Sequence, residues 1–165
     1  MAPERTGIED FLDAYRNAFE AFDASAVADL FTYPCQITSD AGETSVTTVA
    51  DRETWAGQLE RLLDTYREIG VRSAEILDAQ VTELSPRLVQ ATVRWRLLDR
   101  AGARIYDFDA SYTLLDGGEG MRLAAIAHNE TGRLRAAVEQ GRPTESRHRP
   151  AAPAAAVDHG QRRRE

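Results

Sequence analysis

The segment that decides the fold is RLVQATVRWRLLDRAGARIYDFDASYTLLDGGEGMRLAAIAHNE (residues 87–130). Every second residue from Val89 to Leu97 is apolar, and polar residues lie between them. Alternation with a period of two is typical of a strand with one buried face. The same pattern returns from Ile105 to Leu115, and a third run follows the turn DGGEG. The segment therefore predicts long antiparallel strands joined by tight turns.

The length of these strands affects the expected shape of the sheet. At about 3.3 Å per residue they run roughly 40 Å, and a sheet with the native twist does not stay flat over that distance. We therefore expect a curved sheet that half-wraps whatever lies on its concave side, with a pocket there.

The N-terminal half carries helix signals. Thr6 opens a capping box (TGIE), and apolar residues recur at helical spacing over residues 7–22, so a helix is expected to begin at Thr6. Asp23 is a good cap for a short second helix, and Asp51 for a third helix that Gly70 closes. Strands are predicted at 33–39 and 44–49, as a hairpin, and at 71–84.

Length and composition favour one cytoplasmic domain. A chain of 165 residues can bury a single core. The single cysteine, Cys35, excludes an internal disulfide framework and is expected to be a small buried hydrophobe. The sequence has no run of about 18 apolar residues, and its first ten residues are mostly polar, so neither a membrane span nor a secretory signal is expected.

Charge is unevenly distributed along the chain, whose net charge is −7. The part from Arg142 onward is net basic, so the preceding body is more acidic than the whole, which argues against nucleic acid as a partner. The basic part also lacks large apolar residues, which predicts disorder. We divide the chain into an extension (1–6), a folded domain (7–141) and a disordered Ala/Pro/Arg-rich tail (142–165).

The sequence has no recognised catalytic motif: it has no glycine-rich phosphate loop, GxSxG elbow or metal-spaced His/Cys cluster. The candidate catalytic residues are therefore argued one at a time. We expect no metal or cofactor. The hydroxyl of Tyr15, on the apolar face of the first helix, either bonds a ligand or satisfies a carboxylate in the core. Asp107 and Asp109 share the polar face of a strand and are solvated there, unless a bulge turns them inward. Inside an apolar cavity, Asp109 would have a raised pKa and serve as a general acid or base.

His128 and four aromatic residues complete the candidates. His128 ends the last predicted strand beside Glu130, and it is either a hydrogen-bonded structural residue or a proton carrier whose tautomer a neighbouring carboxylate sets. Aromatic side chains fill cores and also line apolar pockets. The candidate ligand-binding residues are Tyr33, Trp55, Trp95 and Tyr112.

The order of helix, short helix, hairpin, helix and four long strands resembles the nuclear transport factor 2-like superfamily, which includes ketosteroid isomerase, scytalone dehydratase and SnoaL-type polyketide cyclases. The residues that carry the resemblance are AYRNAFEAFDASAVADLF and WRLLDRAGARIYDFDASYTLL…GMRLAAIAHNE, within residues 7–131. The resemblance implies an α+β, cone-shaped fold, in which a strongly curved, mostly antiparallel sheet packs against three helices of the N-terminal half and a pocket opens between them.

Only some of the catalytic residues of ketosteroid isomerase have counterparts in this sequence. Its helix-one tyrosine corresponds to Tyr15, and its strand acid to Asp109 after a shift in register. Its base falls on Ser39, beside Asp40, so the usual aspartate is absent. A water-activating His/Asp pair of the superfamily would be represented by His128 with Asp109.

These residues suggest a SnoaL-like protein that binds a small apolar organic molecule, and that would act, if it is an enzyme, by acid–base chemistry of the isomerase, dehydratase or cyclase type. A second hypothesis is a non-catalytic module that forms a homodimer through the polar strand face. That face carries Arg94, Arg96, Asp107, Asp109 and Thr113. A third hypothesis, binding of nucleic acid by the arginine-rich tail, is the least favoured.

Overall fold

The computed structural model describes residues 3–141, with side chains from Gly7 onward. The tail predicted at 142–165 lies outside these residues. The elements are α1 (Pro3–Glu20), α2 (Ala24–Asp29), β1 (Phe31–Asp40), β2 (Thr44–Val49), α3 (Arg52–Ile69), β3 (Ser73–Ser85), β4 (Leu88–Leu98), β5 (Arg104–Asp116), β6 (Met121–His128) and α4 (Glu130–Gln140).

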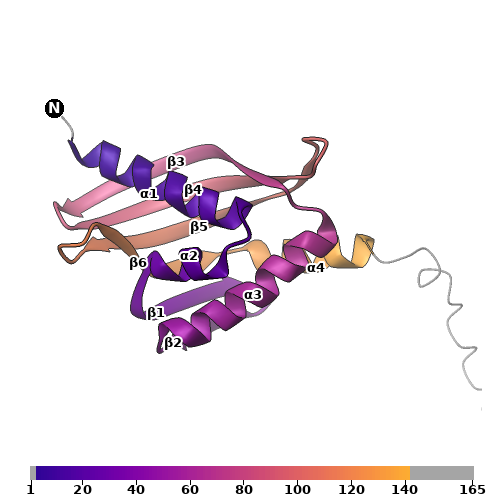
Figure 1. Cartoon of the computed structure of the whole chain (residues 1–165), viewed down its shortest axis with the longest axis horizontal. Coiled ribbons are helices and arrows are strands. Elements are labelled where there is room, and N and C mark those ends of the chain that lie inside the picture. Colours follow the sequence, from indigo (N-terminus) through magenta and orange to yellow (C-terminus); the bar gives the residue numbers. More distant parts are fainter. Residues whose placement is uncertain (1–2, 142–165) are drawn as a thin grey trace, which may run out of the picture.

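The strands form one six-stranded sheet in the order β2-β1-β6-β5-β4-β3. All neighbouring strands are antiparallel except β1 and β6, which run parallel. Figure 1 shows α1, α2 and α3 lying against one face of this sheet, with α4 at one end. The α+β class with a mostly antiparallel sheet is confirmed, and the strong curvature of the sheet stays a prediction.

The predicted alternation determines which face of the long strands is buried. Trp95 of β4 pairs with Phe108 of β5, and Ala91 with Tyr112, and all four side chains face the helices as part of the core. The polar partners on the opposite face pair in the same register, for example Arg94 with Asp109. No slip is needed, because the apolar sets of both strands coincide.

Capping residues fix where α2 and α3 begin and where α3 ends. Asp23 and Asp51 cap α2 and α3 by accepting hydrogen bonds from backbone N–H groups three residues on, as predicted. Gly70 closes α3 in the left-handed conformation. The predicted start of α1 at Thr6 is wrong, since the helix begins at Pro3. Proline suits the first helical turn, where its missing N–H costs nothing.

Two features of the fold were not predicted. The helix α4 follows β6 directly, and only one side of it, with Leu134 and Ala137, packs on the core. The strand β1 pairs with β6 on the side away from β2, so the expected hairpin is one part of a continuous sheet. In the part of the chain with described structure, no helix is long and apolar enough to cross a membrane.

Candidate functional site

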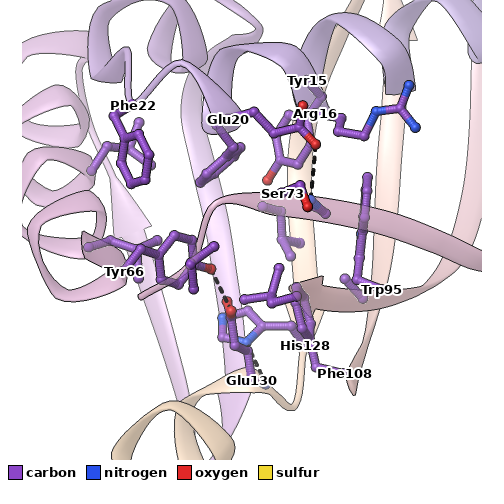
Figure 2. A pocket seen from close by; sticks show the side chains of 18 of the residues that line it. Tyr15, Arg16, Glu20, Phe22, Tyr66, Ser73, Trp95, Phe108, His128 and Glu130 are labelled. Carbon is purple, nitrogen blue, oxygen red and sulfur yellow. Dashed lines mark hydrogen bonds between the residues drawn. The ribbon is translucent and has the colours of Figure 1, made fainter. Parts of the chain in front are cut away.

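A cavity of about 100 Å³ lies between the helices and the apolar face of the sheet. Its walls are mostly aromatic and aliphatic, and they come from α1, α3, β1, β4, β5, β6 and the starts of β3 and α4 (Figure 2). A single water needs roughly 10–15 Å³ measured in this way, so the cavity has room for several waters or a small organic molecule. Tyr15, Trp55, Trp95, Tyr112 and His128 of the sequence candidates line it.

Glu130 is the buried carboxyl of this cavity, with 8% of its surface exposed. Its Oε2 accepts a hydrogen bond from the Tyr66 hydroxyl at 2.5 Å and one from the Tyr106 hydroxyl at 2.9 Å. Burial raises the pKa of Glu130, and the two tyrosine bonds oppose that rise without cancelling it. The carboxyl therefore keeps its proton to higher pH than a solvated glutamate and is suited to proton exchange.

His128 lies beside Glu130 in the same cavity, as Figure 2 shows. Its Nδ1 accepts a hydrogen bond from the backbone N–H of Glu130 at 3.2 Å, and burial lowers the pKa of the ring. An Nδ1 that accepts has no proton, so the neutral ring carries its proton on Nε2. The neighbour that sets the tautomer is thus the backbone of Glu130 rather than a carboxylate.

Tyr15 belongs to a second polar group in the cavity wall. The Trp95 Nε1–H donates to the Tyr112 hydroxyl at 2.8 Å, and the Tyr15 ring meets that of Tyr112 edge to face at 5.6 Å. Burial, followed by the proximity of Tyr112 and Glu130, raises the pKa of Tyr15 well above its ordinary value. Tyr15 is therefore a neutral hydroxyl, able to donate but unsuited to act as a base.

Among the residues that line the cavity only Arg72 is exposed, and its neighbours at the end of α1 and the start of β3 are half-buried, so we take this as the open side. Glu20 reaches across and accepts from the backbone N–H of Ala74 at 3.0 Å. Phe22 adopts a positive φ of 53°, which is unusual for a bulky residue. The guanidinium carbons of Arg67 and Arg72 lie 4.6 and 6.0 Å from the centre of its ring.

Asp109 and Tyr33 lie outside the cavity. Asp109 faces the other side of the sheet, where its carboxylate meets Arg94 at 3.2 Å and its side chain is 43% exposed. Because β5 keeps its regular alternation around this position, the bulge needed to turn Asp109 inward is not there. The Tyr33 hydroxyl donates to the Ala28 carbonyl at 2.7 Å. Ser39, at the position of the isomerase base, bonds the Ser45 hydroxyl on the exposed hairpin.

Asp107 differs from the solvated residue that the polar face suggested. It is only 6% exposed, because Arg96 at 2.9 Å and Arg104 at 3.3 Å cover its carboxylate. The hydrogen bond from Arg96 lowers the pKa of Asp107. This buried carboxylate is thus neutralised on the face opposite the cavity.

The sequence reasoning missed Glu130, Tyr66 and Tyr106 as a group. Tyr66 lies in the apolar stripe of α3, and Tyr106 precedes Asp107 in a strand, so each reads as an ordinary core residue. The one usable signal was the acid directly after the last predicted strand. Among the residues described by the structure, no group of three or more His, Cys, Asp or Glu side chains could hold a metal ion. Cys35 is buried and free.

Comparison with known proteins agrees with this architecture. Residues 4–131 match a family described as NTF2-like protein (DUF6841). The chain belongs to this NTF2-like family. The resemblance to the nuclear transport factor 2-like superfamily is thereby confirmed. No curated protein matches the chain by sequence.

Solved structures resemble this NTF2-like chain at low sequence identity. A Nostoc punctiforme domain of unknown function with a cystatin-like fold has a TM-score of 0.61 and 15% identity, over 89% of this chain and 91% of that one. Aln2 from a Streptomyces species has a TM-score of 0.62 and 16% identity, over 78% and 92%. An NTF2-like protein from Novosphingobium aromaticivorans has a TM-score of 0.61 and 15% identity, over 81% and 88%. Likeness at this level shows a shared fold alone.

Proposed function

We propose that the protein binds a small, mostly apolar organic molecule in the cavity and acts on it by cofactor-independent acid–base chemistry. The observation that carries this proposal is the buried Glu130 carboxyl held by Tyr66 and Tyr106 in an otherwise apolar chamber. A protonated carboxyl in such surroundings donates a strong hydrogen bond to a ligand carbonyl.

A proton acceptor beside this acid supports the catalytic part of the proposal. Burial favours the neutral form of His128, and a neutral imidazole has one nitrogen that can accept a proton. Glu130 polarises the carbonyl of a bound ketone while the histidine takes a proton from the adjacent carbon at Nδ1, once its 3.2 Å hydrogen bond from the Glu130 N–H is broken; the ring then carries protons on both nitrogens. Return of that proton to another carbon is an isomerisation, and loss of a neighbouring hydroxyl as water is a dehydration.

Binding is tested with 2-acetylnaphthalene, a flat apolar ketone, by isothermal titration calorimetry across pH 5 to 9. We expect affinity to fall as the pH rises through the raised pKa of Glu130, because the ionised carboxylate no longer donates. Glu130→Gln should remove this pH dependence, whereas Asp109→Asn, which changes a carboxyl outside the cavity, should retain it. The same pH profile in Glu130→Gln would contradict the assignment.

Catalysis is tested by following deuterium exchange into the acetyl methyl group of the same ketone in D₂O by NMR. The wild-type protein should accelerate the exchange, and His128→Ala should slow it by about 10²-fold or more if the ring is the base. Binding without accelerated exchange would leave a non-catalytic ligand-binding module.

A homodimer is the second candidate, and the apolar residues exposed along β3 and β4 favour it. Leu77, Val81, Leu84 and Leu88 are each at least 36% exposed. The charges named for a dimer interface instead pair within the chain, Arg94 with Asp109 and Arg96 with Asp107. Contact through the apolar residues should give a dimer in sedimentation equilibrium at micromolar concentration, and Val81→Asp should dissociate it. A monomer at that concentration contradicts the dimer.

A further inference from the structure

We infer that the ligand is an amphipathic carboxylate, whose apolar body fills the cavity while its anionic group stays at the open side, against Arg72. This inference rests on the proposed function, since it concerns the same cavity, and it adds the charge and the orientation of the molecule bound there.

The inner end of the cavity excludes an anion. Figure 2 shows Glu130 and His128 on the side opposite Tyr15 and Glu20, and neither supplies a positive charge, because the histidine is neutral and the glutamate is acidic. Burying a carboxylate without a cation or several hydrogen bonds is strongly unfavourable. A charged ligand therefore has to keep its carboxylate away from this end.

The open side carries the cations. Arg16 and Arg72 both line it, together with Glu20. The Arg16 guanidinium is 3.0 Å from Asp13 and thus already has an acidic partner, and Glu20 accepts the backbone N–H of Ala74. These two charged side chains are therefore engaged with partners of their own.

Arg72 is different, because no ion pair is recorded for it among the side chains that the structure describes. One of its N–H groups donates to the Val71 carbonyl at 3.2 Å. A guanidinium has five N–H donors in a planar fork that matches a carboxylate. Arg72 thus retains donors for an anion at the edge of the cavity.

The unusual backbone conformation of Phe22 is a second, independent sign that the open side of the cavity is a binding surface. The residue ends α1 in a Schellman arrangement, with Asp23 N–H bonding the Ala18 carbonyl and Phe22 N–H bonding the Phe19 carbonyl. Glycine is the usual residue at this left-handed position. A phenylalanine there places an aromatic ring in the cavity lining, with Arg67 and Arg72 over it. A flat ligand body meets this ring just where its carboxylate reaches Arg72.

The test uses two probes of nearly equal shape, 2-naphthoate and 2-naphthamide, titrated by calorimetry at pH 7.5 into the full chain. We expect the wild-type protein to bind the naphthoate about two- to fivefold more tightly, as one exposed ion pair provides. Arg72→Gln should remove this preference, and Arg72→Lys should keep part of it. Arg87→Gln removes the same charge from an exposed turn and should leave the preference unchanged.

The outcomes separate the two proposals. Equal affinity for both probes, or a preference that survives in Arg72→Gln, overturns the carboxylate inference and leaves the binding function in place. A preference lost equally in Arg87→Gln overturns it as well, because a general charge effect then explains it. Failure of both probes to bind contradicts the binding function and the inference together. Thermal unfolding checks that each variant is folded.

Discussion

Phe22 and Glu130 are two residues whose local chemistry conflicts with their surroundings. The first is a bulky residue in a conformation that favours glycine, and the second is an acid in an apolar cavity. Each conflict costs stability, and each lies in the lining of the same cavity. Strained or poorly solvated residues of this kind concentrate at functional sites.

The strain at Phe22 is measurable with a pair of variants. Phe22→Gly and Phe22→Ala both remove the ring, so their difference isolates the backbone. With φ at 53°, the glycine variant should be more stable than the alanine variant by about 1 kcal/mol in urea unfolding. Equal stability of the two variants would show that the left-handed conformation is not populated in solution.

The raised pKa of Glu130 predicts a pH-dependent stability difference. Below the unfolded-state pKa, about 4.3, both states hold the proton, and as the pH rises to the folded-state pKa the stabilising contribution is lost. Glu130→Gln lacks this loss and still accepts from both tyrosines. Its free energy of unfolding relative to wild type should therefore increase between pH 4 and pH 8. His128 is present in both proteins, so its own titration cancels, and a constant difference would contradict the buried acid.

At the scale of elements, the two faces of β5 carry different kinds of side chain. Its inward side chains line the cavity with Phe108, Ala110 and Tyr112, while its outward carboxylates pair with arginines. The helix α4 joins these faces at its start, since Asn129 accepts from the backbone N–H of Asp109 at 2.8 Å and the next residue is Glu130. The position of the buried acid therefore depends on the end of β6 and on its contact with β5.

The two outward carboxylates of β5 should differ in what they contribute to stability. Asp107→Asn weakens a bond between a buried carboxylate and Arg96 and should cost about 1–3 kcal/mol. Asp109→Asn affects an exposed pair and should change stability by about 0.5 kcal/mol or less. Because Arg96 lowers the pKa of Asp107, the cost of Asp107→Asn should shrink as the pH falls through that lowered pKa. Equal costs at pH 7, measured by urea unfolding, would contradict the difference in burial.

At the scale of the whole molecule, packing is incomplete on one side of the core. The helices and the sheet enclose a cavity instead of closing on each other, and protein interiors normally leave few voids larger than a water molecule. A protein with such a cavity gives up packing energy that a bound molecule can restore.

A larger side chain in the cavity should stabilise the protein and weaken ligand binding. Ala110 lines the cavity, so Ala110→Val should raise the free energy of unfolding by up to about 1 kcal/mol and weaken binding of 2-acetylnaphthalene by about tenfold or more. Ala91 is equally buried in β4 but does not line the cavity, so Ala91→Val should overpack the core and cost about 1–3 kcal/mol. Urea unfolding and calorimetry check both variants. A similar loss of stability in the two variants would show that the cavity is closed in solution.

The local elements of this protein could be predicted because their signals lie within a few residues. The alternation in β4 and β5, the caps at Asp23 and Asp51 and the stop at Gly70 all depend on neighbouring groups. The order of these elements then indicated the family, and the resemblance, like the length of the strands, implied a pocket. Tyr15, Trp55, Trp95, Tyr112 and His128 were named from the sequence as candidates, and these five line the cavity.

Only the tertiary structure decided which acid enters the cavity. Glu130 meets Tyr66, 64 positions away in the sequence, and Tyr106 on a third element, so no local pattern records the group. The parallel pairing of β1 with β6 is also a contact between distant segments. Asp109 was a reasonable candidate from its residue type, but the strand register turns it toward Arg94. The sequence by itself determined the strands, the first three helices and their buried faces, since these follow from neighbouring residues. The chemistry of the cavity required the folded chain, because burial and hydrogen bonding of a carboxyl depend on what distant segments bring to it.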